Sequence, residues 1–531
     1  TAKVGTEASI AAQVGADATI AVNSAVTISA VGNAQADSDS LGSTVGFALG
    51  VGATFADAIL EGSMESELAG NIVKAGSLSV TTTASNQTTA DSTAASGGIV
   101  GSGSGTESNA RTMPQISAQI AKGGNASITG DVVITTSSVS DATSKALGVT
   151  VAGGVAIGAA IANADLSPTI TTGIGTQEAF GPVLATNVQA NNIIISGYHN
   201  VDVAGNALSN YDSVAEARAG GGGILASGVG ADANATNAPT MSTRVGTGVA
   251  IQSNAAVSLK TLGYNEALTN ALAVSVGGIV GIGATFSDAQ SAGSITTSFD
   301  GSLNLGLTPT GTGGLTLTNR LTADSQSRGE AIGVSVGFTG VGTEVDATIS
   351  TITDSRIGPN GNVTVAGNVD ISNALTTRAN AVSGAVSVSG LLSAGSTPTD
   401  ALITAQALAG IAGGASVTST SGGIYILAGN NYDPLTDRYV SGQGATVSSE
   451  LLTISLAVAV SNGTLTAESK ANVTADVGTN AVLQAVNGTV GIEAWSSNFS
   501  DASVVNNGGA LIRVANSSPT ANVTGITKAI V

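Results

Sequence analysis

A four-residue strand pattern recurs nine times along the chain, with aliphatic residues at its first and third positions. This alternation is typical of a β-strand that buries one face. The nine copies begin at Val26, Leu78, Val132, Ile193, Val257, Leu315, Val369, Ile424 and Val490. Successive copies start 52 to 66 residues apart, with a mean of 58. A degenerate period of this length predicts a repeat architecture in which each unit stacks on the next.

Every unit has the same internal order. The pattern is followed by a polar stretch rich in Ala, Ser, Thr and Asn, and then by an apolar run that is interrupted regularly by glycine, as in residues 146–158 and 271–283. An acidic residue follows this run in most units. Period-2 alternation, 72 glycines and only 3% aromatic residues favour strands over helices.

A unit of this size with so few aromatic residues cannot close a core alone, so neighbouring units must bury it. We therefore expect an all-β fold, a parallel β-solenoid (β-helix) of about nine degenerate repeats. If one coil takes roughly 20 residues, the chain forms ~25 coils and a rod of ~120 Å. A stack of antiparallel β-hairpins is the alternative.

No linker interrupts the repeats, so residues 1–531 are expected to form one continuous array. The array begins and ends in the middle of a repeat. We therefore expect either a piece of a longer array or a subunit that stacks head to tail on copies of itself.

The glycine-alternating runs also raise the question of a membrane span, because residues 146–164 contain no charge over 19 residues. A membrane helix does not need glycine to alternate with valine, or to recur at the same phase in nearly every unit. We therefore favour buried strands, and we expect a protein that does not span a membrane.

The charge balance excludes some partners. Sixteen basic against 35 acidic residues give a net charge of −19, without the clustered Lys and Arg that nucleic-acid phosphates require. The chain has no cysteine, which excludes disulfides and thiolate metal sites and is compatible with export of a long unfolded chain.

Catalytic motifs are absent from the sequence. His199 is the only histidine and is interpreted as structural, and no Gly-x-Ser-x-Gly elbow stands between a strand and a helix. Acidic residues are scattered singly, whereas a glycosidase needs a carboxyl pair at a fixed separation. We expect no enzyme, no catalytic residue and no cofactor, although a β-helical polysaccharide-degrading enzyme remains a third alternative.

Calcium is the one cation that the sequence leaves open. Weak candidate ligands come from the acidic step after the glycine runs: Asp57, Asp165, Asp232, Asp288 and Asp346. With units two to three coils apart, these carboxylates would lie ~10–14 Å from each other, too far to share one cation. An acidic stripe that keeps the surface soluble is the preferred interpretation.

One insertion breaks the repeat. Residues 429–442 carry two of the six tyrosines and are predicted to form a protruding loop. Tyr432, Asp433 and Tyr439 are its candidate partner contacts, and a plain solvent loop is the alternative. A second, lesser candidate spans residues 198–212.

The unit resembles the repeats of giant bacterial surface proteins. Its Val-Thr-Ile pattern, its Ala-rich polar stretch and runs such as residues 276–284 are similar to β-strand-repeat exoproteins and to leukotoxin-type filamentous adhesins. That resemblance implies secretion, a β-solenoid shaft and a role in adhesion or matrix.

We therefore expect an extracellular structural protein on a bacterial cell surface, the shaft or subunit of a surface fibre or biofilm matrix filament. Its partner would be itself, through end-to-end strand stacking. The alternative is an adhesin stalk that binds a receptor or a glycan of a host or neighbouring cell.

Overall fold

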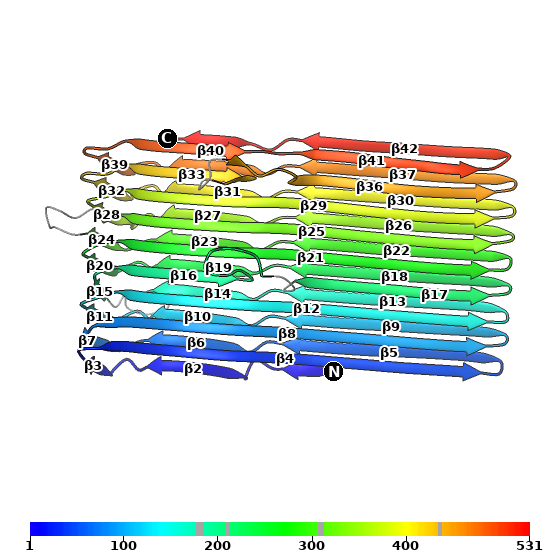
Figure 1. The fold of residues 1–531 in the computed structure, drawn as a ribbon, viewed down its shortest axis with the longest axis horizontal. Coiled ribbons are helices and arrows are strands. Elements are labelled where there is room, and N and C mark those ends of the chain that lie inside the picture. Colours follow the sequence, from blue (N-terminus) through cyan, green and yellow to red (C-terminus); the bar gives the residue numbers. More distant parts are fainter. Residues whose placement is uncertain (177–184, 209–211, 306–312, 434–437) are drawn as a thin grey trace.

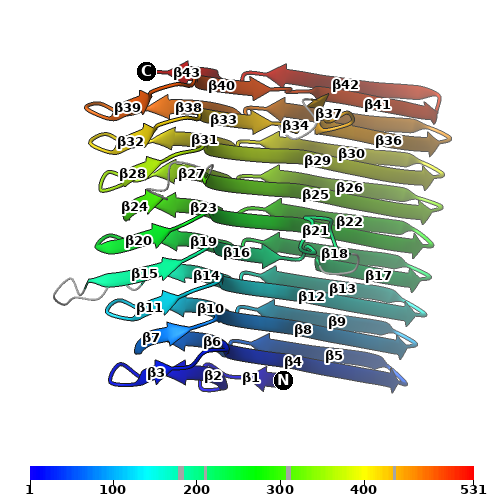
Figure 2. The same ribbon diagram turned by 60° about the vertical axis from the view of Figure 1, so that its left-hand side comes forward.

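The computed structural model describes residues 1–176, 185–208, 212–305, 313–433 and 438–531. The described residues form strands, turns and connecting segments, without a helix. Four large parallel sheets, called A to D here, run the full height of the molecule (Figures 1 and 2). The chain passes through sheets D, A, B and C in turn and then re-enters sheet D one strand higher.

The strands are grouped here by sheet. Sheet A contains β1 (Ala2–Val4), β5 (Leu49–Leu60), β9 (Gly101–Thr112), β13 (Val155–Leu166), β18 (Ala226–Asn237), β22 (Val280–Ser291), β26 (Phe338–Ile349), β30 (Leu392–Ile403), β37 (Val458–Ser469) and β42 (Ile512–Val523). Sheet B contains β2 (Ser9–Val14), β6 (Ser63–Leu68), β10 (Gln115–Ile120), β14 (Thr169–Ile174), β19 (Thr240–Val245), β23 (Ser294–Phe299), β27 (Ile352–Ile357), β31 (Gln406–Ile411), β38 (Asn472–Val477) and β43 (Thr527–Ile530). Sheet C contains β3 (Thr19–Ala21), β7 (Asn71–Ala75), β11 (Asn125–Ile128), β15 (Thr186–Ala190), β20 (Val249–Ser253), β24 (Ser302–Leu305), β28 (Asn362–Val365), β32 (Ser416–Ser419) and β39 (Val482–Ala485). Sheet D contains β4 (Ala25–Gly46), β8 (Ser77–Gly98), β12 (Val132–Ala152), β16 (Ile193–His199), β17 (Ser213–Gly223), β21 (Val257–Gly277), β25 (Leu315–Ser335), β29 (Val369–Ser389), β33 (Ile424–Asn430), β36 (Gly444–Ser455), β40 (Val490–Ser496) and β41 (Ser500–Gly509). A short antiparallel hairpin, β34 (Tyr432–Asp433) and β35 (Arg438–Tyr439), stands apart from these sheets.

The predicted parallel β-solenoid is confirmed, and the repeat pattern marks its register. The first residues of all nine patterns pair directly with one another across sheet D, from Val26 with Leu78 at one end to Ile424 with Val490 at the other. The nine sequence positions therefore form one unbroken column, and each unit is one rung of the stack.

The expected coil of roughly 20 residues is wrong, because one repeat makes a single coil. Strands of sheet D reach 22 residues and those of sheet A reach 12, so one turn of the chain consumes the whole unit. Nine rungs at ~4.8 Å give a stack of roughly 40 Å in place of a rod of ~120 Å.

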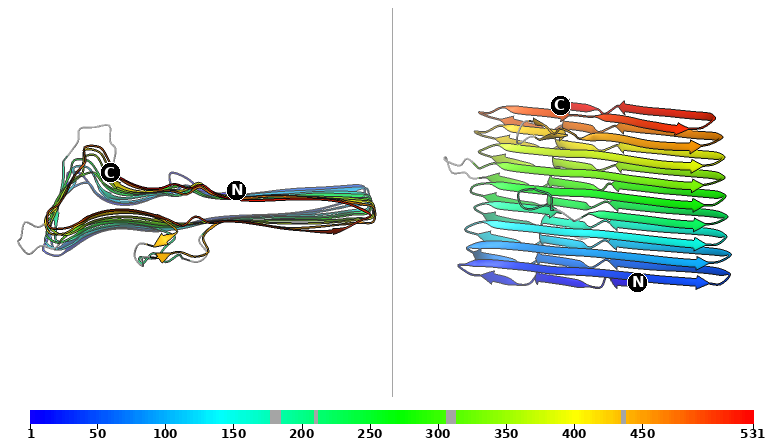
Figure 3. Two further views of the ribbon diagram at one scale, coloured as in Figure 1. Left: turned by 90° about the horizontal axis from the view of Figure 1, so that it is seen from above. Right: turned by 45° about the vertical axis from the view of Figure 1, so that its right-hand side comes forward.

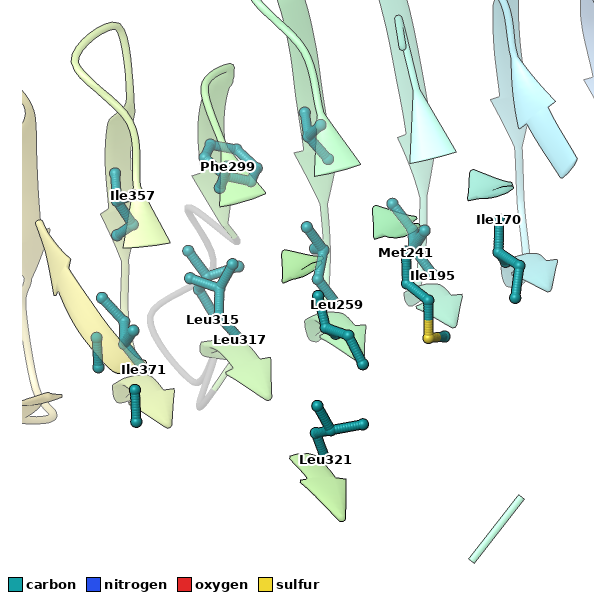
Figure 4. Close-up of a cluster of buried hydrophobic side chains, with 14 of the residues drawn as sticks. Ile170, Ile195, Met241, Leu259, Phe299, Leu315, Leu317, Leu321, Ile357 and Ile371 are labelled. Carbon is teal, nitrogen blue, oxygen red and sulfur yellow. The ribbon is translucent and has the colours of Figure 1, made fainter. Parts of the chain in front are cut away.

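Seen along the stack, each coil has a broad lobe and a narrow lobe (Figure 3). Sheets B and C and the first part of sheet D enclose the broad lobe. Its core is aliphatic, with Ile170, Leu259 and Leu317 fully buried and Phe299 the largest buried side chain (Figure 4). This lobe follows the expected order of Val, Ile and Leu inside with polar residues outside.

The second half of sheet D packs directly on sheet A to form the narrow lobe. Its core consists mainly of alanine, for example Ala58, Ala162 and Ala271, and towards the turn of serine, threonine and glycine. The facing positions are complementary in volume. A Cβ on Gly333 would lie 2.6 Å from Cγ2 of Thr339, and one on Gly158 would lie 3.2 Å from Cγ2 of Thr150. Only small side chains fit where the two sheets approach each other most closely.

The glycine-alternating runs form strands, as predicted, but most of their larger apolar side chains are not buried. In the run of residues 146–158, Gly148 and Ala156 point inward, whereas 59% of Val151 and 62% of Ile157 is exposed. In this run the smaller residues fill the narrow interior and the larger ones face outward. Val229 and Val341 are the reverse case, since each is buried between glycines that face outward.

Candidate functional surfaces

Two insertions leave sheet D at the same position of the repeat. The strand ends at His199 in one rung and at Asn430 in another, six residues after the first residue of the respective pattern. The next residue in each case, Asn200 or Asn431, has a φ in the left-handed region, 52° and 53°. Their Oδ1 atoms accept hydrogen bonds from backbone N–H groups of the adjacent rung, at 2.8 Å from Ser140 and 2.8 Å from Thr377. The asparagines thereby pair groups on β12 and β29 where the strand ladder is interrupted.

The predicted loop at 429–442 contains the hairpin β34–β35, which projects from the outer face of sheet D (Figure 3). Tyr432 is 6% exposed, because its ring stacks on Trp495 at 5.4 Å between centroids and meets Tyr439 edge-on at 5.5 Å. Asp433 accepts a hydrogen bond from Arg320 at 3.1 Å. Arg320 belongs to sheet D, two rungs away from the rung that carries the hairpin.

These contacts divide the three candidate partner residues. Tyr432 and Asp433 attach the hairpin to the solenoid, whereas 53% of Tyr439 is exposed. Trp495 on β40 is 38% exposed beside it and was not singled out in the sequence. Residues 434–437 of the predicted loop lie outside the described residues.

The second insertion follows His199, which is completely buried. Burial lowers the pKa of its imidazole to about 3, so His199 stays neutral. Tyr198 packs against Val201 and Leu262, and Nζ of Lys260 lies 5.7 Å from the centre of the Tyr198 ring. Asn210 and Tyr211, part of the lesser candidate segment, lie outside the described residues.

The structure separates the five weak metal candidates into three columns of sheet A. Asp57, Asp288 and Asp346 belong to one column, which runs from Asp57 through Asn109, Asn163 and Asn234 to Asp288, Asp346 and Asp400. Asp165 stands beside Arg111 in a second column, and Asp232 beside Phe286 in a third. The expected 10–14 Å spacing is wrong because adjacent units are adjacent rungs, which lie only ~4.8 Å apart.

The first column begins as an amide ladder and ends as a row of carboxylates. Asn109 donates to Asp57, and Asn163 donates to Asn109, each at 2.8 Å, as stacked amides do in parallel sheets. Burial, followed by the charges of Asp400, Asp288 and Glu344, raises the pKa of Asp346 to about 6. Within the described part of the chain, no three His, Cys, Asp or Glu side chains come together as a metal site.

A second acidic row, which the sequence reasoning missed, lies on the outer face of sheet D. Asp141, Asp212, Glu266 and Asp324 occupy successive rungs, and Arg378 ends the row on the next one. Burial raises the pKa of Asp141 to about 6, and burial with the charge of Glu266 raises the pKa of Asp212.

Neighbouring side chains offset part of this charge. Tyr264 donates to Glu266 at 2.8 Å, and Nε of Arg378 lies 3.1 and 3.0 Å from the two carboxylate oxygens of Asp324. In four units the row member stands nine residues after the start of the pattern, so aligning the units would have found it. The raised pKa values of Asp346 and Asp141 mean that both rows take up protons as the pH falls below neutrality, which couples the stability of the fold to pH.

The turn of the narrow lobe presents apolar side chains to solvent. Phe47 is 89% exposed, Leu456 77% and Leu511 87%. Eight eleven-residue segments that contain this turn carry no Asp, Glu, Lys or Arg: 43–53, 95–105, 149–159, 220–230, 274–284, 332–342, 386–396 and 452–462. A contiguous exposed apolar surface of this kind is unusual in a soluble monomer, so the turn is a candidate contact surface.

No family model, curated protein or solved structure matches this chain. The described residues contain no helix that could cross a bilayer.

Proposed function

We propose that this chain is a structural protein, a solenoid shaft that builds or extends an extracellular fibre of a bacterial surface. The observation that carries the proposal is the continuous register of sheet D, in which nine homologous positions pair from Val26 to Val490. Sheets A, B and C stack along the same axis as sheet D, and successive units add successive strands to each of them.

Backbone hydrogen bonds along the stack axis make such a shaft stiff. The strands of the first and last rungs have a neighbour on one side only, so each presents N–H and C=O groups that a further rung can pair. That rung can come from the same chain or from a second copy, and either would lengthen the shaft.

The composition supports a place outside the cell. The chain has no cysteine to be trapped in wrong disulfides, and outward positions of the broad lobe carry Ser, Thr, Asn and Gln in place of a dense charge. These features agree with the resemblance to bacterial surface repeats and with export of a long unfolded chain.

The alternative, a stalk that binds a receptor or glycan, has less support. Two of its three candidate contacts, Tyr432 and Asp433, are occupied within the molecule. Exposed Tyr439 and Trp495 are the surface that such a role would use, and replacing both with alanine separates the two functions. Loss of adhesion with intact fibres would favour the stalk.

Electron microscopy of the purified chain at rising concentration, with and without calcium, tests the shaft directly. Long uniform filaments with a ~4.8 Å axial repeat support end-to-end stacking. Isolated particles roughly 40 Å tall at every concentration would contradict self-assembly of this chain. A calcium requirement would assign a role to the Asp288, Asp346 and Asp400 column.

A further inference from the structure

The outer face of sheet A near the turn is corrugated. We call the outward residues of this face the apolar strip. In five consecutive rungs it consists of Leu49, Val51 and Ala53; Gly101, Gly103 and Gly105; Val155, Ile157 and Ala159; Ala226, Gly228 and Gly230; and Val280, Ile282 and Ala284.

Large and small rungs alternate along this strip. Rungs one, three and five form ridges, with Val51 73% and Ile157 62% exposed, and rungs two and four form furrows of glycine and alanine. In the sixth rung the middle column is again glycine, Gly340, but the first column holds exposed Phe338, so the regular alternation covers five rungs. Successive ridges are therefore two rungs, or roughly 10 Å, apart.

Apart from Gly101, where an added Cβ would lie 2.8 Å from Cδ2 of Leu49 in the neighbouring ridge, the furrow glycines have room around them and are not required by the interior of the molecule. A Cβ added to Gly228, Gly230 or Gly105 would meet no atom within 4 Å. These glycines differ in this respect from Gly333 and Gly158, where the opposite sheet leaves no room. Glycine at the furrow positions thus shapes the outer surface alone.

We propose that the apolar strip binds the same strip on a second copy of this chain, with the ridges of each copy seated in the furrows of the other. Over these five rungs, a displacement of one rung places each ridge opposite a furrow, so Ile157 of one copy lies against Gly228 or Gly103 of its partner. Dry interdigitation of this kind is how parallel sheets pair their faces.

The size of the strip suits this occupant. Six residues along each strand and the five corrugated rungs give roughly 20 Å by roughly 24 Å, or roughly 500 Å² on each copy, the area of a weak, reversible contact that many rungs in a bundle would multiply. The strip carries no charge in its first eight rungs, so two copies meet without burying an ion.

The shape of the coil fixes the orientation. Because the broad lobe is thicker than the narrow lobe (Figure 3), two strips meet face to face only when the narrow lobes overlap from opposite directions. This contact is lateral and independent of end-to-end stacking, so it would bundle neighbouring shafts.

A fluid lipid surface would not need furrows, since every added apolar side chain would strengthen its binding. Filling the furrows therefore distinguishes the two. We expect Gly103→Leu with Gly228→Leu to weaken lateral association at least tenfold in sedimentation equilibrium, although the change adds apolar surface. The control, Gly15→Leu, fills an open glycine that follows β2 in the broad lobe, away from the narrow lobe, and should leave association unchanged.

Three results would overturn the proposal: an unassociated native chain, association unaffected by the filled furrows, or binding to neutral phosphatidylcholine vesicles that the filled furrows strengthen. Circular dichroism of each variant checks that the strands are kept. Fibre length in electron microscopy reports end-to-end stacking separately, because furrow filling should narrow bundles without shortening fibres.

Discussion

Asp346 and Asp400 occupy the same position on neighbouring strands of sheet A, with Asp288 in register on the other side. Asp346, which is partly buried, thus stacks between two exposed carboxylates at the rung spacing of ~4.8 Å, and none of the three forms an ion pair among the described residues. Burial and this mutual repulsion raise the pKa of Asp346 to about 6.

The folded state therefore holds a proton on Asp346 at a pH where the unfolded chain has released it. Stability from this group is gained as the pH falls from above 6 towards the unfolded value near 4, and is lost as the pH rises through 6. We expect Asp346→Asn to raise the melting temperature at pH 7.5 and to flatten its rise between pH 7 and pH 5. The new amide stands between Asp288 and Asp400 and can donate a hydrogen bond to either carboxylate.

Thermal unfolding across this pH range measures the effect. Asp17→Asn, at an exposed turn, is the control and should keep the pH dependence of the native chain. A pH dependence for Asp346→Asn equal to that of the native chain would contradict the repulsion argument.

The ion pair between Asp324 and Arg378 is expected to contribute strongly to stability. Asp324 is 4% exposed, so removing Arg378 leaves a buried carboxylate that has lost the positive charge and hydrogen bonds offsetting its burial. Because the Arg378 side chain is itself 42% exposed, Arg378→Met should lower the free energy of unfolding by about 1–2 kcal/mol at neutral pH, and by less once Asp324 is protonated. Urea denaturation of Arg378→Met, Asp324→Asn and the double variant gives the coupling free energy between the two side chains. A double variant no more stable than Arg378→Met would refute this account.

The period in the sequence was sufficient to predict the solenoid and its sheet D register, because the first residues of the patterns pair without a single slip from Val26 to Val490. It could not give the coil length. A period of 58 residues accommodates one long coil or several short ones, and the choice depends on how sheets D and A pair across the narrow lobe.

The orientation of the glycine-alternating runs was also beyond the sequence alone. Alternation predicts two faces but does not say which one is inside. In the broad lobe the larger residues, such as Ile195, are buried, whereas in the narrow lobe Ile157 is outside because Gly158 and Thr150 fill the interior. The hairpin anchor was missed for a similar reason, since Tyr432 and Trp495 are 63 residues apart and meet only through the register of β33 with β40.

Trp495 is the only tryptophan, so its fluorescence reports on the hairpin. Tyr432→Ala removes the ring that stacks on it at 5.4 Å, and we expect a red-shifted emission and stronger quenching by acrylamide with an unchanged far-ultraviolet spectrum. Tyr425→Ala, on the same face of the molecule but without a ring contact to Trp495, should leave the emission unchanged. An unaltered spectrum for Tyr432→Ala would mean that the hairpin does not cover Trp495 in solution.

Gly333 and Gly222 test the packing of the narrow lobe, since both stand in sheet D close to the turn. A Cβ on Gly333 would lie 2.6 Å from Cγ2 of Thr339 and 2.8 Å from Cγ1 of Val341, whereas one on Gly222 would meet nothing within 4 Å. Gly333→Ala should therefore cost about 1–3 kcal/mol of unfolding free energy through overpacking. Gly222→Ala should be neutral or stabilise by up to about 1 kcal/mol, because alanine restricts the unfolded chain. Chemical denaturation of the two variants measures the difference. Equal stabilities of the two variants would mean that sheets A and D can move apart to admit a larger side chain. Their close approach would then no longer explain why large apolar side chains face outward in the apolar strip.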